Sequence, residues 1–408
     1  MINNKLNLVP SICIPFVDND TKHYSEQKIV SLYFKFIDGD IYQINIDHPD
    51  VEKNNIDIGQ IILNEKTLVL NKKLLVHNGI LGGIDLNTYF YYTYNDVIKD
   101  TEFYSVSLEA LINKFKFYSK LYTVIPYAKF IEYCENITQF ILTKYSPDEL
   151  SDKCLQFCND FFEAFTSIER NRLNFSGDEL NQFYNWFTLT SRPSNTWAGI
   201  NFCSLNKTSG VRNQLCSKYN NGKILQFDYD AFHIKLLANI LKYDFTGNPY
   251  EQLKQELNLN ISYSDMKKLI FKNIYGGIQE SFISHPLFAR IQILIDELND
   301  SYIHNDKFNS WFYRKPFTDI KTPTPNKIFN YYIQSLETEY NVKKILILNK
   351  LLDGKKSKLI LYLYDAFIFD IHPDEMNIIE TLENVFKTDT MTVKKSIGDN
   401  FGQLYLIQ

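Results

Sequence analysis

The chain has 408 residues, of which 45% are hydrophobic and 22% charged, and 43 Lys and Arg stand against 48 Asp and Glu. This length and composition exclude a disordered tail and a small disulfide-dependent scaffold, and they predict two or three compact units. The formal net charge of -5 excludes nucleic-acid binding through overall charge. Any such binding would depend on local basic patches.

The cysteine pattern and residues 1–15 favour a location in the cytoplasm. Six cysteines are scattered without CxxC pairs, as is typical of reduced thiols. Residues 1–15 lack the basic start, apolar run and cleavage site of a secretory signal, and no stretch reaches the ~18 apolar residues of a membrane span. We therefore expect a cytoplasmic protein, in the host cytoplasm if it is viral, with no membrane partner.

The N-terminal third has the pattern of short strands separated by turn residues. A helical period follows over residues 107–172, and a long loop rich in Ser, Asn, Gly and Thr covers residues 188–221. The predicted strands are residues 12–17, 29–37, 41–46, 67–70 and 74–77.

Three segments of the C-terminal half place polar side chains at the ends of apolar elements. Residues 224–230 read as a strand that ends near Asp228 and leads into a helix over 231–242. Ser262 caps a predicted helix that carries Lys267, Phe271 and Tyr275 on one face. Residues 358–371 predict a hairpin with Asp365 at its tip.

Two strand-end aspartates far apart in sequence are what a two-metal phosphoryl-transfer site requires, because hard Mg²⁺ ions prefer carboxylate oxygens. Two such ions would activate a 3′-hydroxyl and stabilise the pyrophosphate leaving group. Taken alone, each aspartate is more often a turn or cap residue, and the Lys, Phe and Tyr face is more often an ordinary amphipathic helix.

The order of these segments resembles the family A DNA polymerases. Asp228-Tyr-Asp-Ala-Phe-His233 resembles motif A, Lys267-x3-Phe271-x3-Tyr275 is similar to motif B, and Tyr364-Asp365-Ala366 resembles motif C. Thr190-Ser-Arg192 with Asn201 resembles the motif that grips primer and template, and Asn330-x3-Gln334 is similar to the helix that contacts the duplex minor groove.

The resemblance implies three groups of site residues. Asp228 and Asp365 would be the catalytic residues and hold the two Mg²⁺ ions. The incoming nucleotide would contact Lys267, Lys268, Phe271, Tyr275 and His233. Primer-template DNA would contact Arg192, Asn201, Arg212, Asn330 and Gln334.

The implied fold class is α+β, a right-hand polymerase palm and fingers with a reduced thumb, preceded by a degenerate ribonuclease H-like 3′–5′ exonuclease-type α/β domain. The expected domains are residues 1–150, exonuclease-like and inactive, and residues 151–187, a helical connection or reduced thumb. The palm would cover residues 188–408, with the fingers at about 243–325.

The chain departs from the family pattern at several positions. Tyr263 stands where motif B has an Arg, Tyr364 and Ala366 replace His and Glu in motif C, and His233 replaces the motif A Glu. We expect His233 to occupy the space of a ribose 2′-hydroxyl, with one ring nitrogen on the Tyr275 hydroxyl and the other on water or backbone.

The exonuclease motifs are incomplete. Asp18 and Asp20 match the first motif, but the second motif's Asp falls on Gly82, with Asp85 three positions later. In the third motif, Tyr133 leads to Ile137 instead of an Asp. We therefore expect little or no proofreading.

These patterns predict a DNA-directed DNA polymerase that uses primer-template DNA and deoxynucleoside triphosphates, with a processivity or replisome partner as a further expectation. The compact size suggests a phage-type enzyme of DNA replication. Two alternatives remain open: a catalytically silent nucleic-acid-binding replisome scaffold, and a polymerase specialised for RNA templates.

Overall fold

The computed structural model describes residues 2–17, 23–95, 126–143, 150–206, 210–388 and 390–407. The chain forms two compact units, Met1–Phe162 and Glu163–Gln408, and each is described by itself. The division falls inside helix α6 (Asp152–Arg170), later in the chain than the predicted boundary at residue 150. Within the described residues, no helix is both long and apolar enough to cross a bilayer.

The N-terminal unit is built on a five-stranded mixed sheet in the order β3-β2-β1-β4-β5. The first three strands pair antiparallel, whereas β4 and β5 run parallel to β1 and to each other. The strands are β1 (Ser11–Val17), β2 (Ile29–Phe36), β3 (Ile41–Asn45), β4 (Leu68–Val69) and β5 (Ile84–Asp85), and the helices are α1 (Ile2–Leu8), α2 (Lys72–His77), α3 (Leu86–Tyr94) and α5 (Tyr127–Leu142).

Four of the five predicted strands of this unit are confirmed, but residues 74–77 lie in helix α2 and the strand prediction there is wrong. A short apolar run does not distinguish a strand from a helix by its periodicity. Leu74 and Leu75 are both buried, which a helix achieves by turning both toward the core, whereas consecutive strand residues face opposite sides. Asn78 ends the helix by donating its backbone N–H to the Leu74 carbonyl.

The C-terminal unit contains a five-stranded antiparallel sheet in the order β15-β16-β12-β17-β18. Its central strand β12 has Ile224, Leu225 and Phe227 buried because strands pair on both sides and other elements cover it. The strands are β12 (Lys223–Tyr229), β15 (Lys358–Leu363), β16 (Ala366–Ile371), β17 (Val393–Gly398) and β18 (Tyr405–Ile407). This sheet lies in the segment predicted to be the palm and is called the palm sheet below; the predicted strand and hairpin are confirmed.

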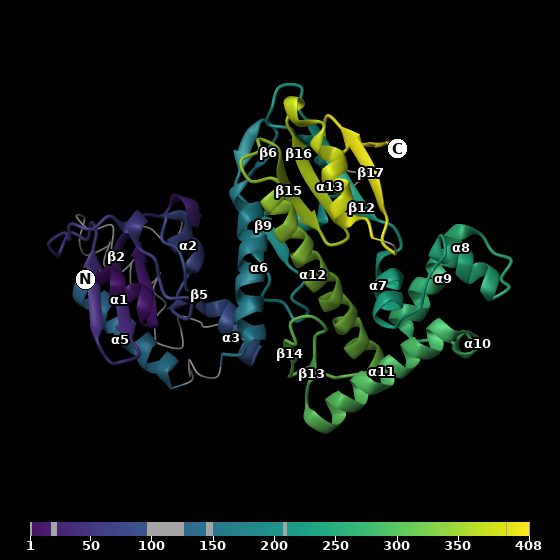
Figure 1. The fold of residues 1–408 in the computed structure, drawn as a ribbon, viewed down its shortest axis with the longest axis horizontal. Coiled ribbons are helices and arrows are strands. Elements are labelled where there is room, and N and C mark those ends of the chain that lie inside the picture. Colours follow the sequence, from purple (N-terminus) through teal and green to yellow (C-terminus); the bar gives the residue numbers. More distant parts are fainter. Residues whose placement is uncertain are drawn as a thin grey trace. The chain divides into compact units, whose positions relative to one another are not determined.

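Helices account for most of the rest of the C-terminal unit. Figure 1 shows α12 as the long helix that leads from the sheet to α11. Thr324 caps α12 through its side chain, and Pro325 follows at the first turn, where a missing N–H costs nothing. The helices are α7 (Phe232–Ile240), α8 (Pro249–Glu256), α9 (Tyr263–Gly276), α10 (Glu280–Ile283), α11 (Pro286–Asn305), α12 (Pro325–Leu351) and α13 (Ile378–Phe386).

Short strands surround the palm sheet. Residues 173–221 form two small sheets in place of a plain loop, and Phe202 and Leu173 pack with Ile368 of the palm in one core cluster. On the other side, Phe386 of α13 contacts Phe227 and Phe367. The short strands are β6 (Leu173–Phe175), β7 (Asp178–Leu180), β8 (Tyr184–Asn185), β9 (Ser194–Trp197), β10 (Ile200–Asn201), β11 (Leu215–Cys216), β13 (Phe308–Asn309) and β14 (Pro316–Phe317).

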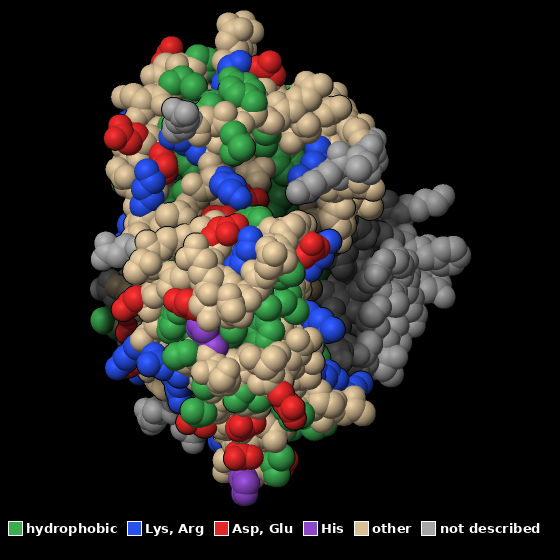
Figure 2. All heavy atoms as spheres, turned by 90° about the vertical axis from the view of Figure 1, so that its right-hand side faces the viewer, with side chains coloured by type: hydrophobic (Ala, Val, Ile, Leu, Met, Phe, Trp, Pro, Cys, Tyr) green, Lys and Arg blue, Asp and Glu red, His purple; other side chains and the backbone are tan. Residues whose placement is uncertain are grey.

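The surface agrees with the absence of a strong overall charge. On the face shown in Figure 2, Lys and Arg side chains are interspersed with Asp and Glu and do not gather in one patch. Nucleic-acid binding through this face would therefore depend on individual contacts.

Candidate active site

The two predicted catalytic aspartates meet at one end of the palm sheet. Asp228 is paired in register with Ala366, the residue directly after Asp365. The backbone N–H of Tyr229 donates to the Asp365 carbonyl over 3.0 Å. A central strand and its neighbouring hairpin thus bring together two residues that lie 137 positions apart in the sequence.

The electrostatics of this pair agree with the geometry. The Asp365 side chain is exposed to solvent at the tip of the hairpin, although nearby protein still desolvates its carboxyl group. This partial burial, followed by the neighbouring charge of Asp228, raises the pKa of Asp365 to about 6. Two mutually repelling carboxylates are a suitable environment for a divalent cation.

The described residues contain no group of three or more His, Cys, Asp or Glu side chains arranged to hold a metal ion. Mg²⁺ is commonly bound by one or two protein carboxylates and completes its coordination with substrate phosphates and water, so two carboxylates would suffice for such ions. Ala366, at the position of the family's second motif C acid, offers no ligand.

The tip of the hairpin is held from two sides. Tyr364 adopts φ +66°, an uncommon conformation for a bulky residue, so surrounding contacts must stabilise it. Asn341 of α12 donates its amide to the Tyr364 carbonyl over 2.6 Å and to the Tyr362 hydroxyl over 3.1 Å. The Arg192 guanidinium lies 3.7 Å from the centre of the Tyr364 ring. These contacts fix the backbone that carries Asp365.

Helix α9 presents the predicted Lys, Phe and Tyr face. Ser262 caps it by accepting the Asp265 N–H, and Gly277 ends it at φ +102°. Its apolar side is buried, whereas Lys267 and Phe271 are exposed and Tyr275 is partly buried. The Phe271 and Tyr275 rings stack with centroids 5.7 Å apart. Lys268 is exposed and pairs with Asp265 at 3.4 Å.

His233 contacts Tyr275 as expected. Its Nδ1 is hydrogen-bonded to the Tyr275 hydroxyl, and this contact joins helix α7 to helix α9. The other nitrogen, Nε2, contacts the carboxylate of Glu337 in α12, so the expectation of water or backbone there is wrong. Burial, then the charge of Glu337, raise the pKa of the Tyr275 hydroxyl.

The predicted minor-groove residues are already engaged within the protein. Asn330 donates its amide to the Tyr275 carbonyl over 3.2 Å, and its Oδ1 is buried without a hydrogen-bond partner. The Gln334 Oε1 accepts from the Thr190 hydroxyl over 3.3 Å. Both side chains thus connect α12 to the segments that flank the candidate site.

The other predicted DNA contacts differ in position. Arg192 is partly exposed and lies at the site, against Tyr364 and Glu337. Arg212 instead donates to the Leu205 carbonyl and packs over the Phe401 ring, where burial lowers its pKa. Asn201 is exposed and accepts the Cys203 N–H. The structure thus places Arg192 against the hairpin that carries Asp365 and gives Arg212 packing contacts.

Sequence patterns missed two charged residues near the aspartates. Glu337 is completely buried and carries no motif signal, because a single acid in a long helix resembles a solvated position. Lys394 of β17 lies in register with Asp228 and pairs with Asp230 at 3.1 Å. Strand alternation does not predict that Lys394 lies beside Asp228 and Asp230, because β12 and β17 are far apart in the sequence.

The N-terminal unit lacks a comparable constellation among its described residues. Asp18 and Asp20 lie outside the described residues. Gly82 has φ +88°, and a Cβ there would lie 2.2 Å from the Leu63 carbonyl oxygen, so no side chain fits.

The remaining exonuclease candidates have structural contacts. Asp85 is buried and caps α3, accepting from the backbone N–H and the hydroxyl of Thr88. Tyr133 and Ile137 are both buried in α5. The Asp85 carboxylate is therefore engaged as a helix cap, and Tyr133 and Ile137 pack in the interior, where Ile137 supplies no acid.

Comparisons with known proteins give one informative result. No protein-family profile and no curated protein matches the chain. Among solved structures it is similar to the POL domain of Pol1 from M. smegmatis in complex with DNA primer-template and dNTP. That likeness has a TM-score of 0.63 at 10% identity and covers 98% of this chain and 97% of that chain. At this identity it establishes the fold alone: the chain has the fold of a family A DNA polymerase, as the resemblance of its motifs implies.

Proposed function

We propose that the chain is a template-directed DNA polymerase that adds deoxynucleotides to a primer 3′ end. The observation that carries this proposal is the meeting of Asp228 and Asp365 at the sheet end beside Tyr275 on the exposed face of α9. The similarity to a polymerase domain bound to primer-template and dNTP supports the same assignment.

Asp228 and Asp365 would hold two Mg²⁺ ions, which supply activation of the primer 3′-hydroxyl and neutralise charge on the leaving pyrophosphate. Lys267 would bind the triphosphate through its exposed ammonium group, because Tyr263 leaves no arginine one turn earlier. Phe271 would pack against the deoxyribose, Tyr275 would contact the nucleotide's base end, and His233 would close the space beside the sugar.

The duplex would lie against the segment of Arg192 and the first half of α12. Arg192 would place its guanidinium at the primer end, and Asn330 and Gln334 would offer amides to the minor groove, where acceptor positions occur on every correct pair. Such contacts read the geometry of a base pair without reading its sequence.

The test is primer extension with Mg²⁺ on DNA and RNA templates. We expect extension on DNA that is lost in Asp228→Ala and in Asp365→Ala while both variants still bind labelled primer-template. Asp399→Ala is the matched control, because Asp399 is an exposed carboxylate that pairs with Lys223 at the opposite end of β12. Near-normal extension by either variant would contradict the site.

The same experiment separates the alternatives. A chain that binds primer-template but extends neither template would be a silent scaffold, and preferential extension on RNA would indicate an enzyme specialised for RNA templates. Omitting Mg²⁺ should abolish extension by the wild-type chain.

A further inference from the structure

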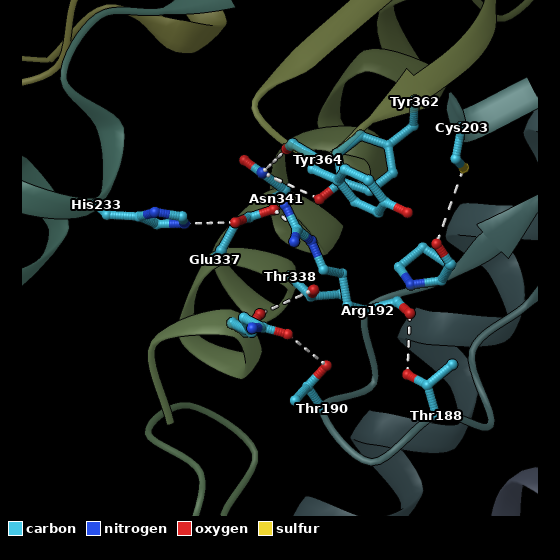
Figure 3. A network of polar contacts seen from close by, with 12 residues as sticks. Thr188, Thr190, Arg192, Cys203, His233, Glu337, Thr338, Asn341, Tyr362 and Tyr364 are labelled. Carbon is cyan, nitrogen blue, oxygen red and sulfur yellow. Dashed lines mark hydrogen bonds and ion pairs between the residues drawn. The ribbon is translucent and has the colours of Figure 1, made fainter. Parts of the chain in front are cut away.

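Glu337 is the central charged group of the polar network shown in Figure 3, and no polymerase motif accounts for it. Its side chain is completely shielded from solvent in α12. A buried carboxylate is costly unless it is paired and hydrogen-bonded, so its partners indicate what it stabilises. Those partners are His233 and Arg192.

The contact with His233 fixes the imidazole ring. An ionised carboxylate only accepts hydrogen bonds, so the ring must carry a proton on Nε2 where it faces Glu337. In the neutral ring, Nδ1 is then an acceptor, and the Tyr275 hydroxyl donates to it. A ring flip would break both bonds, and Glu337 therefore determines both the tautomer and the orientation of His233.

The contact with Arg192 connects the same carboxylate to the hairpin that carries Asp365. The Arg192 Nε lies 3.4 Å from the Glu337 Oε1, an ion pair whose geometry is not that of a hydrogen bond. Arg192 in turn covers the Tyr364 ring. Figure 3 shows His233 and Arg192 approaching Glu337 from different elements.

We propose that Glu337 is a positioning residue for sugar selection, which holds the His233 ring as a rigid wall against a ribose 2′-hydroxyl. The inference rests on the proposed function, in which His233 lies beside the sugar of the incoming nucleotide. Glu337 acts through His233 and does not touch the substrate, because its side chain is fully buried.

The test measures single-nucleotide insertion of matched deoxyribonucleotides and ribonucleotides. Glu337→Gln keeps the shape but lets the amide either donate to or accept from Nε2, so the ring is no longer held in one tautomer. We expect the ratio of kcat/KM for deoxyribonucleotide over ribonucleotide to fall about threefold to tenfold. In the His233→Ala background the same change should have no further effect, because the two residues act as one unit.

Glu339→Gln is the matched control. Glu339 is an equally buried carboxylate two positions along α12, but it accepts the backbone N–H groups of Phe312 and Tyr313. Its loss should lower the melting temperature and leave the sugar ratio unchanged. Unchanged selectivity in Glu337→Gln, or an effect that adds to that of His233→Ala, would overturn the inference.

A spectroscopic measurement tests the inference without a variant of Glu337. ¹⁵N-histidine NMR of the wild-type chain, with His233 assigned by its disappearance in His233→Ala, should show a proton on Nε2. A neutral ring protonated on Nδ1 would overturn the inference even if Glu337→Gln failed to fold. If the wild-type chain inserted no nucleotide at all, the proposed function would fail, whereas the NMR result would still decide the role of Glu337 in holding the ring.

Discussion

Each of the two units contains a five-stranded sheet, but only the sheet of the C-terminal unit carries the candidate catalytic residues among the described residues. In the C-terminal unit, a central strand and a hairpin tip place Asp228 and Asp365 side by side. In the N-terminal unit, the position expected to hold a carboxylate is Gly82, where the Leu63 carbonyl occupies the space of a side chain. A sheet does not by itself provide an active site, because its packing depends on the buried faces whereas catalysis depends on a few residues at strand ends.

The largest expected difference between the units is in polymerase activity. Asp365→Asn should reduce primer extension by about a thousandfold or more, because one of the two proposed metal-binding carboxylates loses its charge. Asp85→Asn in the N-terminal unit should leave the extension rate per folded molecule unchanged, since Asp85 caps α3. If Asp85→Asn reduced primer extension as much as Asp365→Asn, the polymerase activity would not depend on the C-terminal unit alone.

The second prediction concerns the backbone at Gly82. Gly82→Ala should destabilise the N-terminal unit by about 2 kcal/mol or more, because it combines a left-handed φ with a clash against the backbone. Gly39→Ala is the control, since Gly39 has φ +97° but no atom within 4 Å of the added Cβ. It should cost about 1 kcal/mol.

Denaturant unfolding can report the two units separately. All three Trp residues lie in the C-terminal unit, so their fluorescence follows that unit while circular dichroism follows the whole chain. Equal effects of the two glycine substitutions would mean that Gly82 tolerates a side chain and that the exonuclease position is open.

The third prediction concerns sugar selection. His233→Ala should raise ribonucleotide incorporation relative to deoxyribonucleotide by about tenfold, equivalent to about 1.4 kcal/mol of lost discrimination. The physical reason is the removal of the ring that contacts Tyr275 and fills the space beside the sugar. His304→Ala, on the exposed side of α11, is the control in the same single-nucleotide kinetics. An unchanged ratio would mean that another residue is the gate.

A smaller effect is expected on stability. Partial burial and then the charge of Asp228 raise the pKa of Asp365 to about 6, so the folded protein binds this proton more tightly than the unfolded chain. The stabilisation is therefore full below about pH 4 and is lost as the pH rises through about 6. Because solvent screens the carboxyl, Asp365→Asn should stabilise the Mg²⁺-free protein by about 1 kcal/mol at about pH 8 and by little at about pH 4. A gain that did not depend on pH in denaturant unfolding would contradict this assignment.

The smallest expected effect is on proofreading. A primer with a mismatched 3′ end should survive incubation with Mg²⁺ in the absence of nucleotides, and Asp18→Ala should change nothing. Rapid removal of the mismatched end that Asp18→Ala abolishes would show that the N-terminal unit is an active exonuclease despite Gly82.

The sequence by itself determined the elements that carry the candidate site. Strand alternation, a helix cap and a turn between apolar runs are local signals, and they placed Asp228, Asp365 and the face of α9 correctly. The resemblance to motif A and motif B also implied that His233 meets Tyr275, and the structure shows this contact. By contrast, residues 74–77 form a run too short for its periodicity to distinguish helix α2 from a strand.

Only the tertiary structure decided which partners the site residues have. Glu337 lies 104 positions from His233, Arg212 packs on Phe401, and the Leu63 carbonyl blocks Gly82. The periodicity of apolar residues in the sequence predicts none of these three contacts. They depend on the distance and orientation between packed elements, and a buried charge in a long helix gains its role from whatever that packing places beside it.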